Sequence, residues 1–71
     1  MDNYFASNLK HLRAIYDISQ AELAKTIGVD QTAISKWEKG QREPSISVAL
    51  AVAEFFRINI DSLASKDLRS L

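Results

Sequence analysis

The chain lacks cysteine altogether, and its 71 residues include only one proline and two glycines. Without cysteine, no disulfide or cysteine-ligated metal can support a domain of this small size. No run approaches the roughly eighteen apolar residues of a membrane span, and the first ten residues lack the basic and apolar regions of a signal peptide. We therefore expect one cytoplasmic domain that has no contact with a membrane.

Residues that carry catalysis or bind metals are also scarce. His11 is the only histidine, and it lies away from the apolar stripe of its predicted helix. No serine has a histidine partner, and the carboxylates are not spaced for a metal or for acid–base catalysis. We predict no catalytic residue, no metal, no cofactor and no small-molecule ligand.

Two short helices joined by a tight turn are encoded in the middle of the chain. Ser19 and Glu22 have the spacing of a capping box, in which each side chain accepts a backbone N–H of the other residue. A helix is therefore predicted to begin at Gln20. Gly28, which adopts the left-handed conformation without strain, ends this helix after Ile27.

A second helix follows after about three residues, the linkage expected of a helix-turn-helix. Asp30 is a suitable cap, so this helix is predicted to begin at Gln31. The side that attaches it to a core consists of Ala33, Ile34 and Trp37, with Glu38 at its edge. The opposite side has only hydrogen-bonding or cationic side chains: Gln31, Thr32, Ser35, Lys36 and Lys39.

This polar side suits the base edges of the DNA major groove. An amide can pair with adenine, a lysine can donate to guanine, and a threonine methyl can contact the methyl of thymine. The same pattern also fits the solvated side of any amphipathic helix, but the capped turn and the basic loop favour DNA. The predicted base-reading residues are Gln31, Thr32, Ser35 and Lys36.

The loop over residues 39–45 carries two cations, a glycine and a proline. Such a loop can fix the register of a protein on the phosphate backbone, and a glutamine at the start of the preceding helix can do the same. The predicted phosphate contacts are Gln20, Lys39, Gln41 and Arg42.

The balance of nine basic against nine acidic residues speaks against strong DNA binding. The cations Lys36, Lys39 and Arg42 nevertheless cluster at the predicted binding edge. We therefore expect moderate non-specific affinity, with specificity that depends on base contacts and on dimerisation.

At these residues the sequence resembles the phage repressor and Cro-like helix-turn-helix family, of the xenobiotic-response-element type. SQAELA, IGV, the run from Ile34 to Gly40, and Pro44 with Ser45 match the family pattern, and the resemblance spans roughly residues 7 to 64. It implies an all-α, compact five-helix, lambda-repressor-like domain with the helix-turn-helix at its second and third helices. It also implies the base contacts above, the phosphate contact of Gln20, and a structural ion pair between Arg13 and Glu38.

The remaining helices are predicted around this motif, within a domain of residues 1–66. The first runs from about Asn3 to Tyr16, with Phe5, Leu9, Leu12 and Tyr16 in the core. A fourth runs from about Ile46 to Phe56, with Leu50, Ala53 and Phe56 at the centre, and a fifth from Ile60 to about Ser65 after an Asn59 cap. Arg57 stands where the family often has glycine or asparagine, and Lys66 to Leu71 has no clear structure, so residues 67–71 form a short tail.

These observations predict a transcriptional regulator, a repressor that binds a near-palindromic double-stranded DNA operator as a homodimer. The dimer interface is expected at the C-terminal part, from Phe55, Ile58, Ile60 and Leu63, although the same residues could simply close the core. Two alternatives stay open. The fold could hold a protein partner, as in an antitoxin, or the chain could be the DNA-binding part of a longer repressor.

Overall fold

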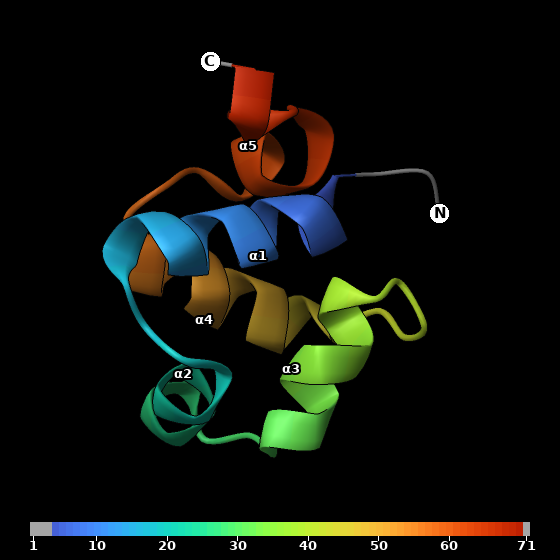
Figure 1. Ribbon diagram of the computed structural model, residues 1–71. Helices are drawn as coiled ribbons and strands as arrows, with labels where there is room; N and C mark the ends of the chain where they lie inside the picture. Colours follow the sequence, from blue (N-terminus) through green and yellow to red (C-terminus); the bar gives the residue numbers. More distant parts are fainter. Residues whose placement is uncertain (1–3, 71) are drawn as a thin grey trace.

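The computed structural model describes residues 4–70, which form five α-helices and one short 3-10 helix (Figure 1). The elements are α1 (Phe5–Tyr16), α2 (Gln20–Ile27), α3 (Gln31–Glu38), α4 (Ile46–Phe56), α5 (Ile60–Ser65) and η1 (Leu68–Ser70). No strand occurs in this range, and the prediction of an all-α five-helix domain is confirmed. The predicted start of the first helix at Asn3 lies outside the described residues.

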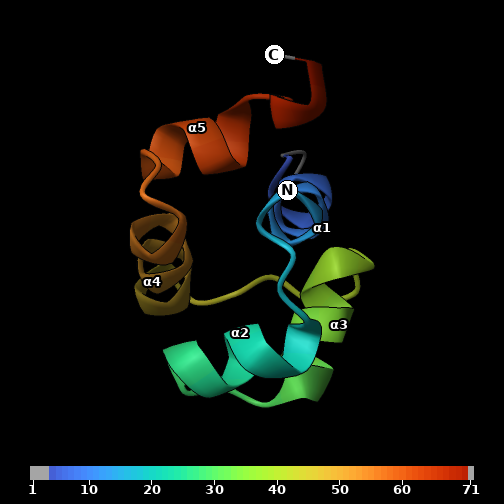
Figure 2. The ribbon, with the colours of Figure 1, turned by 60° about the vertical axis from the view of Figure 1, so that its left-hand side comes forward.

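Helix α1 lies between α5 on one side and the α2–α3 pair on the other (Figures 1 and 2). It packs on both α3 and α5, while α4 packs on α2 and α5. Since α2 and α3 also pack on each other, the helix-turn-helix is supported from behind by α1 and α4. No helix in the described part of the chain is long and apolar enough to cross a bilayer.

Each of the five helices contributes one completely buried aliphatic side chain to a single core. These side chains, all with 0% of their surface exposed, are Leu9, Leu23, Ile34, Val52 and Leu63. Burial of one such side chain stabilises a fold by about 1.5–3 kcal/mol relative to exposure. All five helices are therefore held by the same apolar cluster.

Two residues predicted in the core are not there. Tyr16 is 52% exposed, although the edge of its ring packs on Phe56. Leu50 is 50% exposed, and Val52 takes the central place in α4. The two polar residues of α4, Ser47 and Glu54, lie seven residues apart on one side of the helix and are exposed, and Leu50 lies on this same outward side. The packing of α4 on α2 and α5 turns Val52 and Ala53 into the core.

Helices α1 and α4 both end at a non-glycine residue in the left-handed conformation. The φ angle is 55° at Asp17 and 56° at Arg57. The following residues close the helices, because the N–H of Ile18 donates to the carbonyl of Arg13 (3.1 Å) and that of Ile58 to the carbonyl of Ala53 (3.0 Å). This is the Schellman arrangement, in which glycine is favoured at the left-handed position. At Arg57 the Cβ atom therefore imposes steric strain on the backbone.

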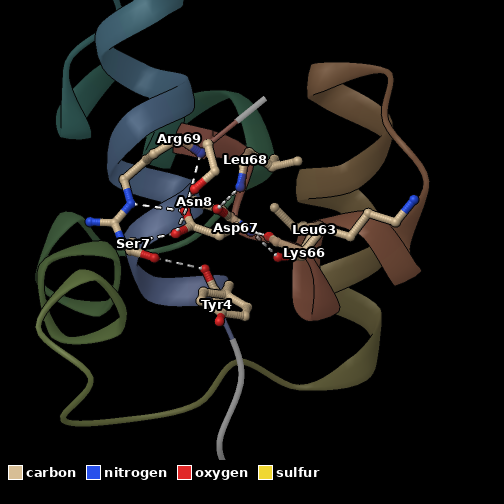
Figure 3. A network of polar contacts seen from close by, with 9 residues as sticks. Tyr4, Ser7, Asn8, Leu63, Lys66, Asp67, Leu68 and Arg69 are labelled. Atoms are coloured by element: carbon tan, nitrogen blue, oxygen red, sulfur yellow. Dashed lines mark hydrogen bonds and ion pairs between the residues drawn. The ribbon is translucent and has the colours of Figure 1, made fainter.

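The prediction that residues 66–71 lack structure is wrong for Leu68–Ser70, which form η1; Leu71 lies outside the described residues. The completely buried Asn8 holds this end of the chain against α1 (Figure 3). Its Nδ2 donates to the carbonyls of Leu63 (2.7 Å) and Lys66 (2.6 Å), and its Oδ1 accepts from the N–H of Leu68 (3.0 Å). A buried polar residue on α1 therefore joins the two ends of the fold.

Replacing Arg57 with glycine is expected to raise the free energy of unfolding by about 0.5–1 kcal/mol. Glycine removes the strain of the left-handed conformation, which costs about 1–2 kcal/mol. Part of this gain is offset because glycine is more flexible in the unfolded chain and loses more conformational entropy on folding. Arg57→Ala retains a Cβ atom and is the matched control, expected near the native value. Urea denaturation measures both, and a glycine variant no more stable than the alanine variant would contradict the strain at Arg57.

Candidate nucleic-acid interface

The two ends of α2 are built by local interactions. The N–H of Glu22 donates to Ser19 Oγ (3.0 Å), and the N–H of Ser19 donates to Glu22 Oε1 (2.9 Å). The hydrogen bond from the Ser19 N–H to the Glu22 carboxylate, followed by a hydrogen bond with the Ser19 side chain, holds the pKa of Glu22 below its usual range. Gly28 ends the helix with φ at 77°. The predicted capping box and left-handed turn are both confirmed.

Asp30 is the N-cap of α3, which begins at Gln31 as predicted, although the Asp30 side chain makes no capping hydrogen bond. Its backbone is extended, as a cap requires, and its carbonyl accepts from the N–H of Ala33 (3.0 Å). A carboxylate near a helix N-terminus remains favourable through the helix dipole alone. The turn from α2 to α3 is therefore closed mainly by Gly28 and by Val29, which packs on the core.

Helix α3 is attached to the domain along one side. Ile34 is completely buried and Trp37 is 4% exposed, and the Trp37 ring meets Phe5 of α1 edge-on, with 6.5 Å between ring centroids. The side chains predicted to read bases remain accessible along the rest of the helix. Gln31 and Thr32 are exposed, and Ser35 and Lys36 are half-buried.

A largely buried ion pair joins α1 to the last residue of α3. Arg13 Nε donates to Glu38 Oε2 (2.6 Å) and Nη2 donates to Glu38 Oε1 (2.9 Å), while 17% of the Arg13 side chain and 5% of the Glu38 side chain are exposed. Gln20, the first residue of α2, adds a third donor, since its Nε2 lies 3.0 Å from Glu38 Oε1. The carboxylate thus receives hydrogen bonds from two other helices.

The network also sets the acidity of Glu38. Burial raises the pKa of this carboxyl, but the hydrogen bonds from Arg13 and Gln20 and the positive charges of Arg13 and Lys10 outweigh burial. Its pKa consequently lies below the usual range of a glutamate. The folded domain therefore favours the ionised form.

The loop after α3 folds back on the end of that helix. The N–H of Gly40, where φ is 72°, donates to the carbonyl of Trp37 (3.1 Å), and that of Gln41 to the carbonyl of Lys36 (2.9 Å). Figure 1 shows the loop beside α3, on the side away from α2. The predicted phosphate contacts of this loop, Lys39, Gln41 and Arg42, are all exposed, whereas Gln20 is half-buried against Glu38.

The residues expected at a dimer interface are placed unequally. Leu63 is completely buried, so it closes the core and offers no surface to a second subunit. Phe55, Ile58 and Ile60 are half-buried and pack on the same core. Sequence reasoning missed Ile46, which is 72% exposed on α4.

The described residues contain no group of three or more His, Cys, Asp or Glu side chains that could hold a metal ion. His11 lies half-buried on α1. The chemistry available on α3 and its loop is hydrogen bonding by amides and hydroxyls and attraction by cations, which suits the edges and the backbone of a nucleic acid.

Comparison with known proteins assigns residues 9–63 to the helix-turn-helix family. An uncharacterised HTH-type transcriptional regulator of Methanocaldococcus jannaschii is 37% identical over 57 residues, which are 80% of this chain and 86% of that protein. The transcriptional activator BcrR of Enterococcus faecalis is 38% identical over 61 residues, 86% of this chain but 30% of BcrR. The repressor protein C2 of Salmonella phage P22 is 39% identical over 51 residues, 72% of this chain and 24% of C2. The chain thus spans less than a third of BcrR and of C2.

Solved structures agree with these matches. The P22 c2 repressor in complex with a synthetic operator superposes with a TM-score of 0.83 at 32% identity, covering 89% of this chain and 96% of that one. A transcriptional regulator from Listeria innocua shares the fold, with a TM-score of 0.84 over 99% of this chain and 71% of that one, at 22% identity.

The depressed pKa of Glu38 predicts a pH-dependent contribution to stability. The contribution is complete above the pKa of an unfolded glutamate, about 4.3, and is lost as the pH falls through the lower pKa of the folded state. At pH 7, Glu38→Gln is expected to lower the free energy of unfolding by about 1–3 kcal/mol, since it replaces the charged partner of the half-buried Arg13. The difference from the native chain should shrink as the pH falls below about 4.

Urea denaturation across this pH range measures the difference, with Glu54→Gln as the matched control because Glu54 is exposed on α4. The control should change stability by less than about 0.5 kcal/mol. A Glu38→Gln effect that is the same at every pH would rule out an ionised Glu38 as its source.

Proposed function

Because the chain belongs to the helix-turn-helix family of DNA-binding transcriptional regulators, we propose that it is a repressor that binds a near-palindromic operator as a dimer. Each subunit places α3 in the major groove. The observation that carries this proposal is the division of α3 into a buried side, with Ile34 and Trp37, and an accessible polar side. The similar P22 c2 repressor was solved in complex with a synthetic operator, which supports DNA as the partner.

The accessible side of α3 provides the chemistry of base recognition. The amide of Gln31 can pair with adenine, Lys36 can donate to guanine acceptors, and the methyl of Thr32 can contact thymine. Ser35, one turn further along, completes the four base-reading residues. Since the helix is held from behind, the backbone positions of these four residues are fixed before DNA binds.

Phosphate contacts surround this set on both sides. Lys39, Gln41 and Arg42 in the loop hold one stretch of backbone, and Gln20 at the start of α2 holds another. Because the chain has a net charge of zero, these contacts give only moderate affinity for arbitrary sequences, and specificity depends on base reading and on dimerisation.

Dimerisation joins two copies so that their reading helices face successive major grooves, about 34 Å apart. We place the contact at Phe55, Ile58 and Ile60, which keep part of their surface accessible. The protein acts in the cytoplasm, where the DNA of bacteria and archaea lies. The similarity to the activator BcrR favours activation as the second candidate, since the same reading surface serves either outcome.

Selection from random duplexes at low salt is expected to enrich a palindromic motif with half-sites about one helical turn apart. Gln31→Ala and Lys36→Ala should each weaken binding to the selected duplex by about 1–3 kcal/mol and relax the preference at the bases they contact. Circular dichroism establishes that the variants remain folded.

Arg42→Gln provides the contrast expected of a phosphate contact. It should weaken binding to all duplexes and leave the selected motif unchanged, and the slope of log affinity against log salt concentration should become smaller by about 1. Lys66→Ala, on the C-terminal side of α5, is the control and should bind as the native chain does. If no motif is enriched, the chain is a protein-interaction module; if a single asymmetric half-site is enriched, binding as a dimer is wrong.

A further inference from the structure

The carboxylate of Glu38 determines which end of the Gln20 amide points toward it. An ionised carboxylate has no proton and can only accept hydrogen bonds, so the NH2 group of Gln20, rather than its carbonyl oxygen, must face Glu38. The distance from Gln20 Nε2 to Glu38 Oε1 is 3.0 Å. The amide is therefore held in one of its two possible orientations.

Glu38 is itself held firmly. Its side chain is 5% exposed and receives two hydrogen bonds from Arg13. A third group of Arg13, Nη1, donates to the carbonyl of Ile18 (3.0 Å), directly before the Ser19 cap of α2. The support of Gln20 thus extends through α3, α1 and the linker that leads into α2.

We propose that Glu38 is a positioning residue for the contact between Gln20 and a DNA phosphate. This inference rests on the proposed DNA-binding function. An amide nitrogen has two hydrogens; one is used by Glu38, and the second remains for a phosphate oxygen. The guanidinium of Arg13 compensates the negative charge of Glu38, so the carboxylate does not repel the phosphate.

The benefit of this arrangement is preorganisation. A glutamine that is already ordered loses less side-chain freedom when it binds, and the saving is worth about threefold to tenfold in affinity. In Glu38→Gln, the new amide can present either oxygen or nitrogen to Gln20, so the orientation is no longer determined. Gln20 should then contribute little to DNA binding.

NMR of the free protein tests the orientation without DNA. In the native chain, the Gln20 side-chain proton donated to Glu38 is expected to have a downfield chemical shift. The difference in chemical shift between the two side-chain amide protons should therefore be larger for Gln20 than for the exposed Gln41. Glu38→Gln should abolish this extra separation, and Glu54→Gln should preserve it. If this chemical-shift difference were the same for Gln20 and Gln41 in the native chain, the proposal would be overturned. That comparison needs only the native chain, so it decides the question even if Glu38→Gln failed to fold.

A double-mutant cycle on the selected duplex tests the consequence. Gln20→Ala should weaken binding by about threefold to tenfold in the native background, and by less than about twofold in the Glu38→Gln background. Equal losses in both backgrounds would show that Glu38 is merely structural and would overturn the positioning role. If the native chain selects no duplex, the proposed function fails, whereas the NMR experiment still decides the orientation of Gln20.

Discussion

The ion pair between Arg13 and Glu38 is the interaction on which the proposed DNA-reading side of α3 depends. It joins the middle of the chain to α1 at the point where α3 ends, with only 5% of the Glu38 side chain exposed. A buried pair contributes little net stability compared with an apolar contact, but loss of one partner leaves the other charge stranded. Its main effect is therefore to define how α3 sits on the domain, together with the buried Ile34 and Trp37.

The rest of the structure supports this geometry from behind. The aliphatic core, with one completely buried residue from each helix, fixes α1 and α4 against the α2–α3 pair. Asn8 extends the same support to the C-terminal end through bonds to Leu63, Lys66 and Leu68. Because these elements hold the backbone of α3 in place, only its accessible side chains are free to change conformation.

The sequence predicted most of the fold where the signals were local. The capping box of Ser19 and Glu22, the turn at Gly28 and the two sides of α3 were all readable, because each depends on residues within about one helical turn. The place of Leu50 was predicted wrongly, although a signal was present: the polar Ser47 and Glu54 lie on the same side of α4 as Leu50 and mark that side as outward. The order of residues 66–70 also escaped prediction, since Asn8 lies 55 to 60 residues away from its partners. The base-reading and phosphate-binding roles remain predictions.

A crystal structure of the chain with its selected duplex is the most direct test of the central claim, that a fixed α3 presents four side chains to DNA bases. We expect Gln31, Thr32, Ser35 and Lys36 to face base edges in the major groove, with the Arg13–Glu38 bonds kept as in the free protein. A complex in which α3 lies outside the groove, or in which that ion pair is broken, would contradict it.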